Sequence, residues 1–259
     1  MTGQRPVAGG TRRTGILLVT GASRGIGAAT ALVGARSGYA VAVHYGTHRA
    51  EAEAVCDQIR ASGGKAGAFG ADMGSEAEIM RLFAAVDAGL GTVSALVNNA
   101  GGIFGVRAIA DSEAALIERT LAVNLAGPIY CCREAVRRMS TERGGAGGAI
   151  VNISSMAAVL GGLPNEVHYA ASKGGVDALT IGLAREVAMQ GIRVNAIRPG
   201  VIDTPIHQLH GAGFAQSFAG NLPMQRAGTA DEIARAAIWL LSDDASYVTG
   251  SILNVSGGR

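Results

Sequence analysis

Residues 16–27 read ILLVTGASRGIG, a stretch that joins an apolar run to a glycine-rich turn and then opens a helical pattern. Glycines let the backbone turn tightly and approach a pyrophosphate, while a helix start offers free N–H groups and positive potential. The spacing is Gly-x-x-x-Gly-x-Gly rather than the commoner Gly-x-Gly-x-x-Gly, and such trios arise by chance in a chain with 39 glycines. The position between a predicted strand and a predicted helix nevertheless favours a dinucleotide-binding loop.

The rest of the chain continues this alternation of strand and helix. Near-continuous apolar runs, typical of strands covered by helices on both faces, predict strands at 16–20, 40–44, 66–70, 95–98, 149–153, 193–197 and 252–255. Helical patterns intervene near 26–37, 48–62, 75–90, 113–142, 166–190 and 230–242. The alternation predicts the α/β class, with one doubly wound, mostly parallel, Rossmann-type sheet of about seven strands and helices on both faces. Because there is no internal repeat or linker, we expect residues 15–259 to form one NAD(P)-binding catalytic domain.

Composition and charge exclude several classes of protein. Of the 259 residues, 48% are apolar and 16% charged, and the net charge of +2 is too small to indicate a nucleic-acid or membrane partner. No apolar run reaches the roughly 18–20 residues that span a bilayer. Cys56, Cys131 and Cys132 lack the spacing of metal ligands. Residues 1–14 lack the apolar centre of a signal peptide, so we expect a disordered leader on a cytoplasmic protein.

The end of the second predicted strand bears on the choice of nucleotide. An acidic residue there would bind the ribose 2′-hydroxyl of NAD, but residues 41–50 contain no carboxylate. The region instead offers His44, His48 and Arg49, and Arg24 lies inside the glycine loop. Guanidinium groups suit a 2′-phosphate because they form bidentate hydrogen bonds, so NADP is preferred over NAD. A solvated residue at a helix start is an equal alternative for Arg49.

Tyr169 and Lys173 stand four residues apart in a predicted helix, where such positions are neighbours on one face. An ammonium group beside a phenol favours the phenolate, so we expect the pKa of Tyr169 to lie below its usual value of about 10. A phenol tuned in this way can transfer a proton at working pH. Taken alone, the pair is more often an exposed Tyr and Lys on a helix surface. The adjacent His168 is expected to be a surface histidine.

The order of these pieces resembles that of the short-chain dehydrogenase/reductase family from Gly15 onward. Besides the glycine loop and the Tyr-x-x-x-Lys pair, the resemblance is carried by Asn98-Asn99-Ala100-Gly101, Asn124, a serine before the tyrosine, and Arg198-Pro199-Gly200. Each motif is modest alone, but their combination in this order is specific.

The resemblance implies four catalytic residues. Tyr169 would protonate the carbonyl oxygen or act as the base in the reverse reaction, and Lys173 would lower its pKa and bind the nicotinamide ribose. Ser155 would donate to the substrate oxygen, although the adjacent Ser154 leaves the choice open and alignment with the family favours Ser155. Asn124 would hold a water that links Lys173 to solvent. Without the resemblance, Asn124 is equally a backbone-bridging residue and Ser155 a common turn residue.

The same resemblance, together with the glycine loop, implies the residues that hold the cofactor. Asp72 would contact the adenine, and Asn98 would make a backbone contact beside the cofactor. Val201 and Thr204 would hold the carboxamide end. No metal is needed, because the phenol, hydroxyl and lysine polarise the substrate. The full set of expected cofactor-binding residues is Gly21, Ser23, Arg24, Gly25, Ile26, Gly27, Arg49, Asp72, Asn98, Ala100, Gly101, Tyr169, Lys173, Pro199, Gly200, Val201 and Thr204.

We therefore expect an oxidoreductase that transfers hydride between NADP(H) and a small ketone, aldehyde or secondary alcohol. The alternative is a cofactor-binding regulator or sensor that keeps the fold without turnover. The family resemblance implies a homotetramer in which the helices near 113–142 and 166–190 pack across subunits. Residues 203–225 are expected to form a lid whose Phe214 and Phe218 contact the substrate.

Overall fold

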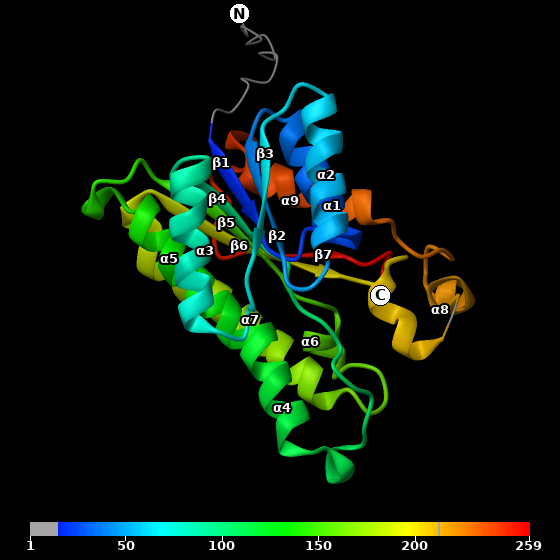
Figure 1. Cartoon of the computed structure of the whole chain (residues 1–259). Helices are drawn as coiled ribbons and strands as arrows, with labels where there is room; N and C mark the ends of the chain where they lie inside the picture. Colours follow the sequence, from blue (N-terminus) through cyan, green and yellow to red (C-terminus); the bar gives the residue numbers. More distant parts are fainter. Residues whose placement is uncertain (1–14, 212) are drawn as a thin grey trace, which may run out of the picture.

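A computed structural model of the chain describes residues 15–211 and 213–259 (Figure 1). Within these ranges, seven strands form a single sheet in the order β3-β2-β1-β4-β5-β6-β7, and every neighbouring pair is parallel. This confirms the predicted doubly wound α/β class. The predicted leader, residues 1–14, lies outside the described residues. The strands are β1 Ile16–Val19, β2 Ala40–Tyr45, β3 Ala66–Gly70, β4 Val93–Asn98, β5 Gly148–Ile153, β6 Ile192–Pro199 and β7 Ile252–Val255.

Helices cover both faces of the sheet (Figure 1). Alternate residues of a strand point to opposite faces, so Leu17 belongs to one hydrophobic core and Leu18 to the other, and both are fully buried. This two-sided burial explains why the strands are continuously apolar instead of alternating. The first core is closed by α1 Gly25–Arg36, α2 Arg49–Ala61 and α9 Ala230–Leu241, and the second by α3 Glu76–Gly89, α5 Gly127–Met139 and α7 Val167–Val187.

Local sequence fixes where several of these helices begin. Thr229 and Glu232 form a capping box at the start of α9, in which each side chain bonds the backbone N–H of the other residue. The side chain of Ser75 caps α3 by accepting from the N–H of Glu78. Pro128 stands in the first turn of α5, directly after the π turn, and has no N–H to donate to the preceding turn.

The predicted helix at 113–142 is interrupted in the structure. It consists of α4 Ala114–Leu121, a π-helical turn at Ala122–Ala126, and α5. Two short helices, α6 Ala157–Leu160 and α8 Phe214–Phe218, lie in segments where the sequence predicted none. A π turn inside a helix frequently marks a functional position, and this one carries the buried Asn124.

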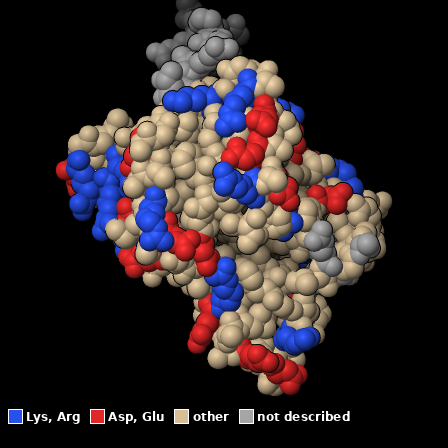
Figure 2. All heavy atoms as spheres, viewed as in Figure 1, with Lys and Arg blue, Asp and Glu red and all other residues tan. Residues whose placement is uncertain are grey.

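The sheet is built outward from its middle, with β1, β2 and β3 following one another to one side and β4 to β7 to the other. The loops that leave the carboxyl ends of β1 and β4 therefore diverge, and a crevice lies between them. The glycine loop follows β1, and the Asn98-Asn99-Ala100-Gly101 stretch begins at the end of β4. On the face drawn in Figure 2, acidic and basic side chains are interspersed around a central hollow. Over the described ranges, every helix is too short or too polar to cross a bilayer.

Candidate functional site

The glycine loop is held in a shape that requires glycine. Gly21 has a φ of +64°, in the left-handed region, and a Cβ on Gly27 would overlap the carbonyl oxygen of Gly21. Helix α1 begins at Gly25, and among the described residues no side chain caps its start. Its first turn carries no acidic residue, so its free N–H groups and the positive end of its dipole can receive an anion. These features fit the pyrophosphate of a dinucleotide.

Two side chains brace this loop, and the sequence did not identify either one as a brace. His44 Nδ1 accepts from the backbone N–H of Gly21 at 2.9 Å, and His44 Nε2 lies 3.0 Å from the carbonyl oxygen of Ala71. Burial lowers the pKa of His44 to about 4, so the ring is neutral and donates through Nε2. Asn99 Nδ2 donates to the carbonyl oxygens of Thr20 and Gly21 at 2.9 and 3.0 Å. His44 is therefore a buried support and not a group available to a nucleotide phosphate.

A long cleft runs from this loop across the carboxyl ends of the strands. We define the long cleft by its lining, which includes most of the predicted cofactor residues: Gly21, Ser23, Arg24, Gly25, Ile26, Asp72, Ala100, Gly101 and Thr204. Eight predicted residues are not among the described lining residues: Tyr169, Lys173, Pro199, Gly200 and Val201 line a neighbouring pocket, and Gly27, Arg49 and Asn98 line neither cavity. Arg49 begins α2 with an exposed side chain, and Asn98 Nδ2 donates to Asn152 Oδ1 at 2.9 Å inside the sheet. The structure thus places Arg24, but not Arg49, in the cleft.

The far wall of the long cleft contains an ion pair that the sequence did not reveal. Arg119 donates to Asp72 Oδ2 at 2.9 Å, and the N–H of Gly74 donates to Asp72 Oδ1 at the same distance. The hydrogen bond from Arg119 holds the pKa of the Asp72 carboxyl below its usual value. The guanidinium of Arg119 also lies over the Phe104 ring, 5.6 Å from its centroid. Arg119 comes from α4, and no local motif in the sequence pairs it with Asp72.

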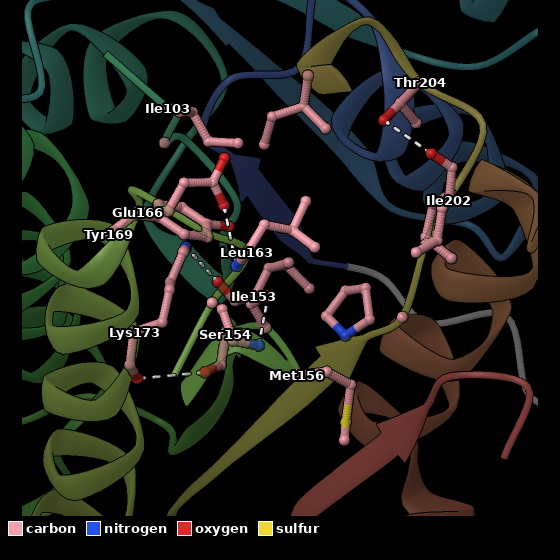
Figure 3. A pocket seen from close by; sticks show the side chains of 18 of the residues that line it. Ile103, Ile153, Ser154, Met156, Leu163, Glu166, Tyr169, Lys173, Ile202 and Thr204 are labelled. Carbon is pink, nitrogen blue, oxygen red and sulfur yellow. Dashed lines mark hydrogen bonds between the residues drawn. The ribbon is translucent and has the colours of Figure 1, made fainter. Parts of the chain in front are cut away.

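An inner pocket adjoins the long cleft and contains the predicted tyrosine and lysine (Figure 3). The inner pocket and the long cleft share lining residues that include Ile26, Asn99 and Thr204. Tyr169 and Lys173 are both buried and lie on the same face of α7, with Lys173 Nζ 5.8 Å from the centroid of the Tyr169 ring. Lys173 Nζ donates to the carbonyl oxygen of Ile153 at 2.9 Å.

The ionisation of this pair differs from the sequence-based expectation. Burial raises the pKa of Tyr169 to about 12, because the phenolate loses its hydration, and the charge of Glu166 acts in the same direction. A hydrogen bond between Ser155 and Tyr169 opposes the shift. Burial also lowers the pKa of Lys173 to about 8, against the influence of Asp177. The expectation of an acidified Tyr169 was wrong for the isolated chain, because the spacing of two residues carries no information on their burial.

The two adjacent serines face different partners. Ser154 is buried and its hydroxyl donates to the carbonyl oxygen of Lys173 at 3.2 Å. Ser155 Oγ accepts from the backbone N–H of Ala157 at 3.1 Å and shares a hydrogen bond with Tyr169. The structure therefore brings Ser155, and not Ser154, to the tyrosine hydroxyl.

Asn124 fastens the loop that follows β4. Its Oδ1 accepts from the N–H of Gly102 and its Nδ2 donates to the carbonyl oxygen of the same residue, both at 2.9 Å. A Cβ on Gly101 would lie 2.8 Å from Asn124 Oδ1 and 3.5 Å from Lys173 Nζ. Asn124 Oδ1 and Lys173 Nζ therefore both lie close to Gly101, a residue that lines both cavities.

The inner pocket is also lined by three predicted cofactor-binding residues, Pro199, Gly200 and Val201. Two other sequence-based expectations differ from the structure. Phe214 and Phe218 stack on each other with centroids 5.5 Å apart, and they are not among the described residues that line the pocket. They instead pack around a small cluster that includes Val201 and Leu222. His168 is buried, not a surface residue.

Comparisons with known proteins agree with this geometry. Residues 21–259 match a family model described as enoyl-(acyl carrier protein) reductase. The chain is 50% identical over 245 residues to the oxidoreductase YgfF of Escherichia coli (strain K12), covering 94% of this chain and 99% of that protein. It is 36% identical over 241 residues to the 3-oxoacyl-[acyl-carrier-protein] reductase FabG of Staphylococcus aureus (strain Mu50), covering 93% and 96%. A crystal structure of a dehydrogenase/reductase from Sinorhizobium meliloti 1021 superposes with a TM-score of 0.86 at 33% identity, covering 94% of each chain.

Proposed function

The chain belongs to the short-chain dehydrogenase/reductase family of oxidoreductases, and from that premise we propose that it transfers hydride between NADP(H) and a small carbonyl or secondary alcohol substrate. The observation that carries the proposal is the meeting of Ser155 and Tyr169 in an inner pocket that adjoins the glycine-loop cleft. The long cleft has the anion-receptive helix start that a dinucleotide requires, and the inner pocket has a mostly apolar wall that suits a small organic substrate.

The chain's own residues would hold the nucleotide at both ends of the long cleft. The N–H groups at the start of α1 receive the pyrophosphate, and Asp72 lies where the adenine end is expected. Thr204, beside Gly25, lines both cavities, and Lys173 lines the inner pocket close to Gly101. When bound, the nicotinamide supplies the hydride chemistry, and the protein supplies binding, orientation and the proton.

In the reducing direction, Tyr169 donates its hydroxyl proton to the substrate's carbonyl oxygen. Ser155 donates a second hydrogen bond to that oxygen, so both hydroxyl groups stabilise the negative charge that develops on it. A pKa of about 12 keeps Tyr169 protonated at neutral pH, which is the state that this step requires. Lys173 and Asn124, which both lie close to Gly101, would return a proton from solvent to Tyr169.

The preference for NADP rests on the residues at the end of β2. Thr47 and His48 line the long cleft there, and Arg24 of the glycine loop lines the same cleft. No carboxylate occupies residues 41–50, so a 2′-phosphate meets cationic and hydroxyl groups instead of negative charge.

The direct test is to follow NADPH oxidation by the full chain across a panel of aliphatic, aromatic and cyclic ketones and aldehydes. The proposal expects carbonyl-dependent oxidation with at least one class of substrate. Failure on every substrate despite tight NADPH binding would instead favour a regulator or sensor that keeps the fold without turnover. Failure to bind either nucleotide would contradict both functions, because a ligand of the native state must raise Tm.

The assembly expected from the family resemblance, a homotetramer, is also a proposal. Apolar side chains project from the helices that the resemblance assigns to the subunit interface. Ile129 on α5 is 41% exposed and Ile181 on α7 is 37% exposed. Covering these side chains with a second copy of the chain would remove apolar surface from water.

A further inference from the structure

Asp177 is a buried carboxylate on α7 that is not among the described residues lining either cavity. Arg198 of β6 approaches its Oδ2 with Nε at 2.9 Å and Nη2 at 2.8 Å. The other oxygen, Oδ1, is buried and has no hydrogen-bond partner among the described residues. Burying a charged pair is costly, and an unpartnered buried oxygen adds to the cost, so stability alone does not account for this pair.

The position of Asp177 on its helix relates it to Lys173. The two residues are both buried and stand at i and i+4 on one face of α7. Side chains on a helix point back toward its N-terminus, so the carboxylate of Asp177 lies over the turn that carries Lys173. For the same reason, Lys173 points back toward Tyr169. The phenol, the ammonium and the carboxylate therefore follow one another along the helix.

Neighbouring strands hold the ammonium and the carboxylate. Lys173 Nζ donates to the carbonyl oxygen of Ile153, at the end of β5 (Figure 3). Ile153 pairs with Ile197 of β6, and Arg198 is the next residue of that strand. The ion pair of Asp177 with Arg198 thus ties α7 to the carboxyl end of β6, whose following residues line the inner pocket.

The other charges around Lys173 belong to the inner pocket or to other partners. The titratable residues that line the inner pocket with Lys173 are Glu166, Tyr169 and Arg259. Of the elements that pack against α7, α6 and the π turn carry no titratable residue, and Glu118 and Arg119 of α4 are exposed. The charged side chains of α5 pair with one another and with α3, and Arg193 of β6 donates to carbonyl oxygens at the end of α9. The charge that raises the pKa of Lys173, against the effect of burial, is that of Asp177.

We propose that Asp177 is a positioning residue: held by Arg198, its carboxylate keeps Lys173 in the ammonium form, able to return a proton to Tyr169. The inference rests on the proposed function, which assigns this return of a proton to Lys173. Burial alone favours the neutral amine, whereas an opposite charge in a site of low dielectric constant favours the ammonium. The buried Oδ1 of Asp177, which no described donor neutralises, supplies that opposite charge.

The charge of Lys173 can be followed directly, because the chain contains two lysines, Lys65 and Lys173. When lysine is labelled with ¹³C at Cε, the spectrum of the full chain has two signals, and Lys65→Arg identifies the one from Lys173. Asp177→Asn keeps the shape of the side chain and removes its charge, so the pKa of Lys173, read from the pH dependence of its signal, should fall by at least about 1. Arg198→Met leaves the carboxylate without its neutralising partner and should raise this pKa.

Opposite changes in the two variants distinguish an effect of charge from a loss of packing. A broken tie between α7 and β6 would move the Lys173 signal in the same direction in both variants. Changes of the same sign, or no change in Asp177→Asn, would therefore overturn the inference. The control Glu186→Gln removes an exposed carboxylate from the same helix and should leave the signal unchanged.

A double variant keeps the test decisive if a single substitution prevents folding. Asp177→Leu combined with Arg198→Met replaces the ion pair by apolar side chains, an exchange that buried pairs often tolerate. It should lower the pKa of Lys173 as Asp177→Asn does, because both remove the same negative charge. An unaltered pKa of Lys173 in the folded double variant would equally overturn the inference.

The pH dependence of turnover tests the same pair through the reaction. Since Lys173 must carry a proton, kcat for carbonyl-dependent NADPH oxidation should fall as pH rises through its pKa. This fall should occur at lower pH in Asp177→Asn and at higher pH in Arg198→Met, with kcat near that of the unmodified chain on the acidic side. A loss of kcat by the same factor at every pH in both variants would indicate a structural role only and would overturn the inference.

The two measurements separate this inference from the proposed function. Opposite changes of the Lys173 signal without turnover in any chain would support the role of Asp177 and refute the proposed function alone. Turnover in the unmodified chain, with a Lys173 signal that neither substitution moves, would refute the inference and leave the proposed function standing.

Discussion

Ser154 and Ser155 are neighbours in the chain, yet their hydroxyl groups have different partners. Ser155→Ala removes the group that meets Tyr169, so turnover should fall about 10²–10³-fold, as for loss of one oxyanion donor. Ser154→Ala removes a bond to the Lys173 carbonyl and should cost about 1 kcal/mol of stability while turnover is largely retained. Steady-state kinetics measures the turnover of both variants, and thermal unfolding measures their stability. Equal losses of turnover would contradict the assignment.

His44 makes the stability of the protein sensitive to acid. Its pKa is about 6.5 when unfolded and about 4 when buried, so between these values only the unfolded state gains a proton. The free energy of unfolding should therefore fall by about 3 kcal/mol from this residue as pH drops through that window. His44→Asn keeps an acceptor for Gly21 but cannot titrate.

Urea unfolding of both chains at several pH values checks this expectation. The difference in the free energy of unfolding between the unmodified chain and His44→Asn should narrow or reverse as pH falls from 6.5 to 4. Over this range only the unmodified chain has a residue at position 44 that takes up a proton on unfolding. A difference that is constant over this range would show that His44 does not titrate as described.

For single residues, the sequence predicted which positions share a helix face better than it predicted the surroundings of each side chain. The four-residue spacing placed Tyr169 and Lys173 on one helix face, which the structure also does. The direction of the Tyr169 pKa could not be predicted, because it depends on desolvation by residues distant in sequence. The same limit applies to His44, which looked like a candidate for a phosphate and is a buried brace.

The start of α1 is the element on which the choice of nucleotide depends. Arg24→Ala should weaken NADPH binding about 10-fold or more while affecting NADH much less, because only NADPH carries the 2′-phosphate. Arg49→Ala is the matched control, since Arg49 is exposed and is not among the described residues lining the long cleft. Fluorescence titration with both nucleotides gives the four dissociation constants. Equal weakening of NADPH and NADH in Arg24→Ala would contradict recognition of a phosphate.

Elements with strong periodicity could be predicted from the sequence, and short or irregular elements could not. The helix pattern at 113–142 runs continuously, but the structure inserts a π turn at Ala122–Ala126 so that Asn124 reaches Gly102. The π turn has only five residues, too few positions for its different period to be read from the amphipathic pattern. Helices α6 and α8 have only four and five residues, fewer than two turns, so periodicity has too few positions to register them.

For the whole molecule, the sheet could be predicted because each strand is buried on both faces. Continuous apolar runs separated by helices admit few topologies once right-handed crossovers are required. The site is harder to predict, because it joins residues from the carboxyl ends of β1 to β6 with one face of α7. The pairing of Asp72 with Arg119 spans 47 residues of sequence and becomes visible only in the folded chain.

The proposed homotetramer can be tested by measuring the mass of the assembled protein. Light scattering during gel filtration should give a mass about four times the chain's 26.1 kDa. Ile129→Glu together with Ile181→Glu places charge on the exposed faces of α5 and α7, and should yield smaller species that still bind NADPH. A monomeric unmodified chain, or a tetramer that both substitutions leave intact, would contradict this interface.

The central claim is that the hydroxyl of Tyr169 transfers a proton to or from the substrate oxygen. Tyr169→Phe keeps the ring and removes only this hydroxyl, so the measurement is carbonyl-dependent NADPH oxidation beside NADPH affinity in the two chains. The account predicts that turnover falls by about 10²–10⁴-fold, the usual contribution of a placed acid, with NADPH affinity unchanged. A Tyr169→Phe chain that reduces the same carbonyl at an undiminished rate would contradict it.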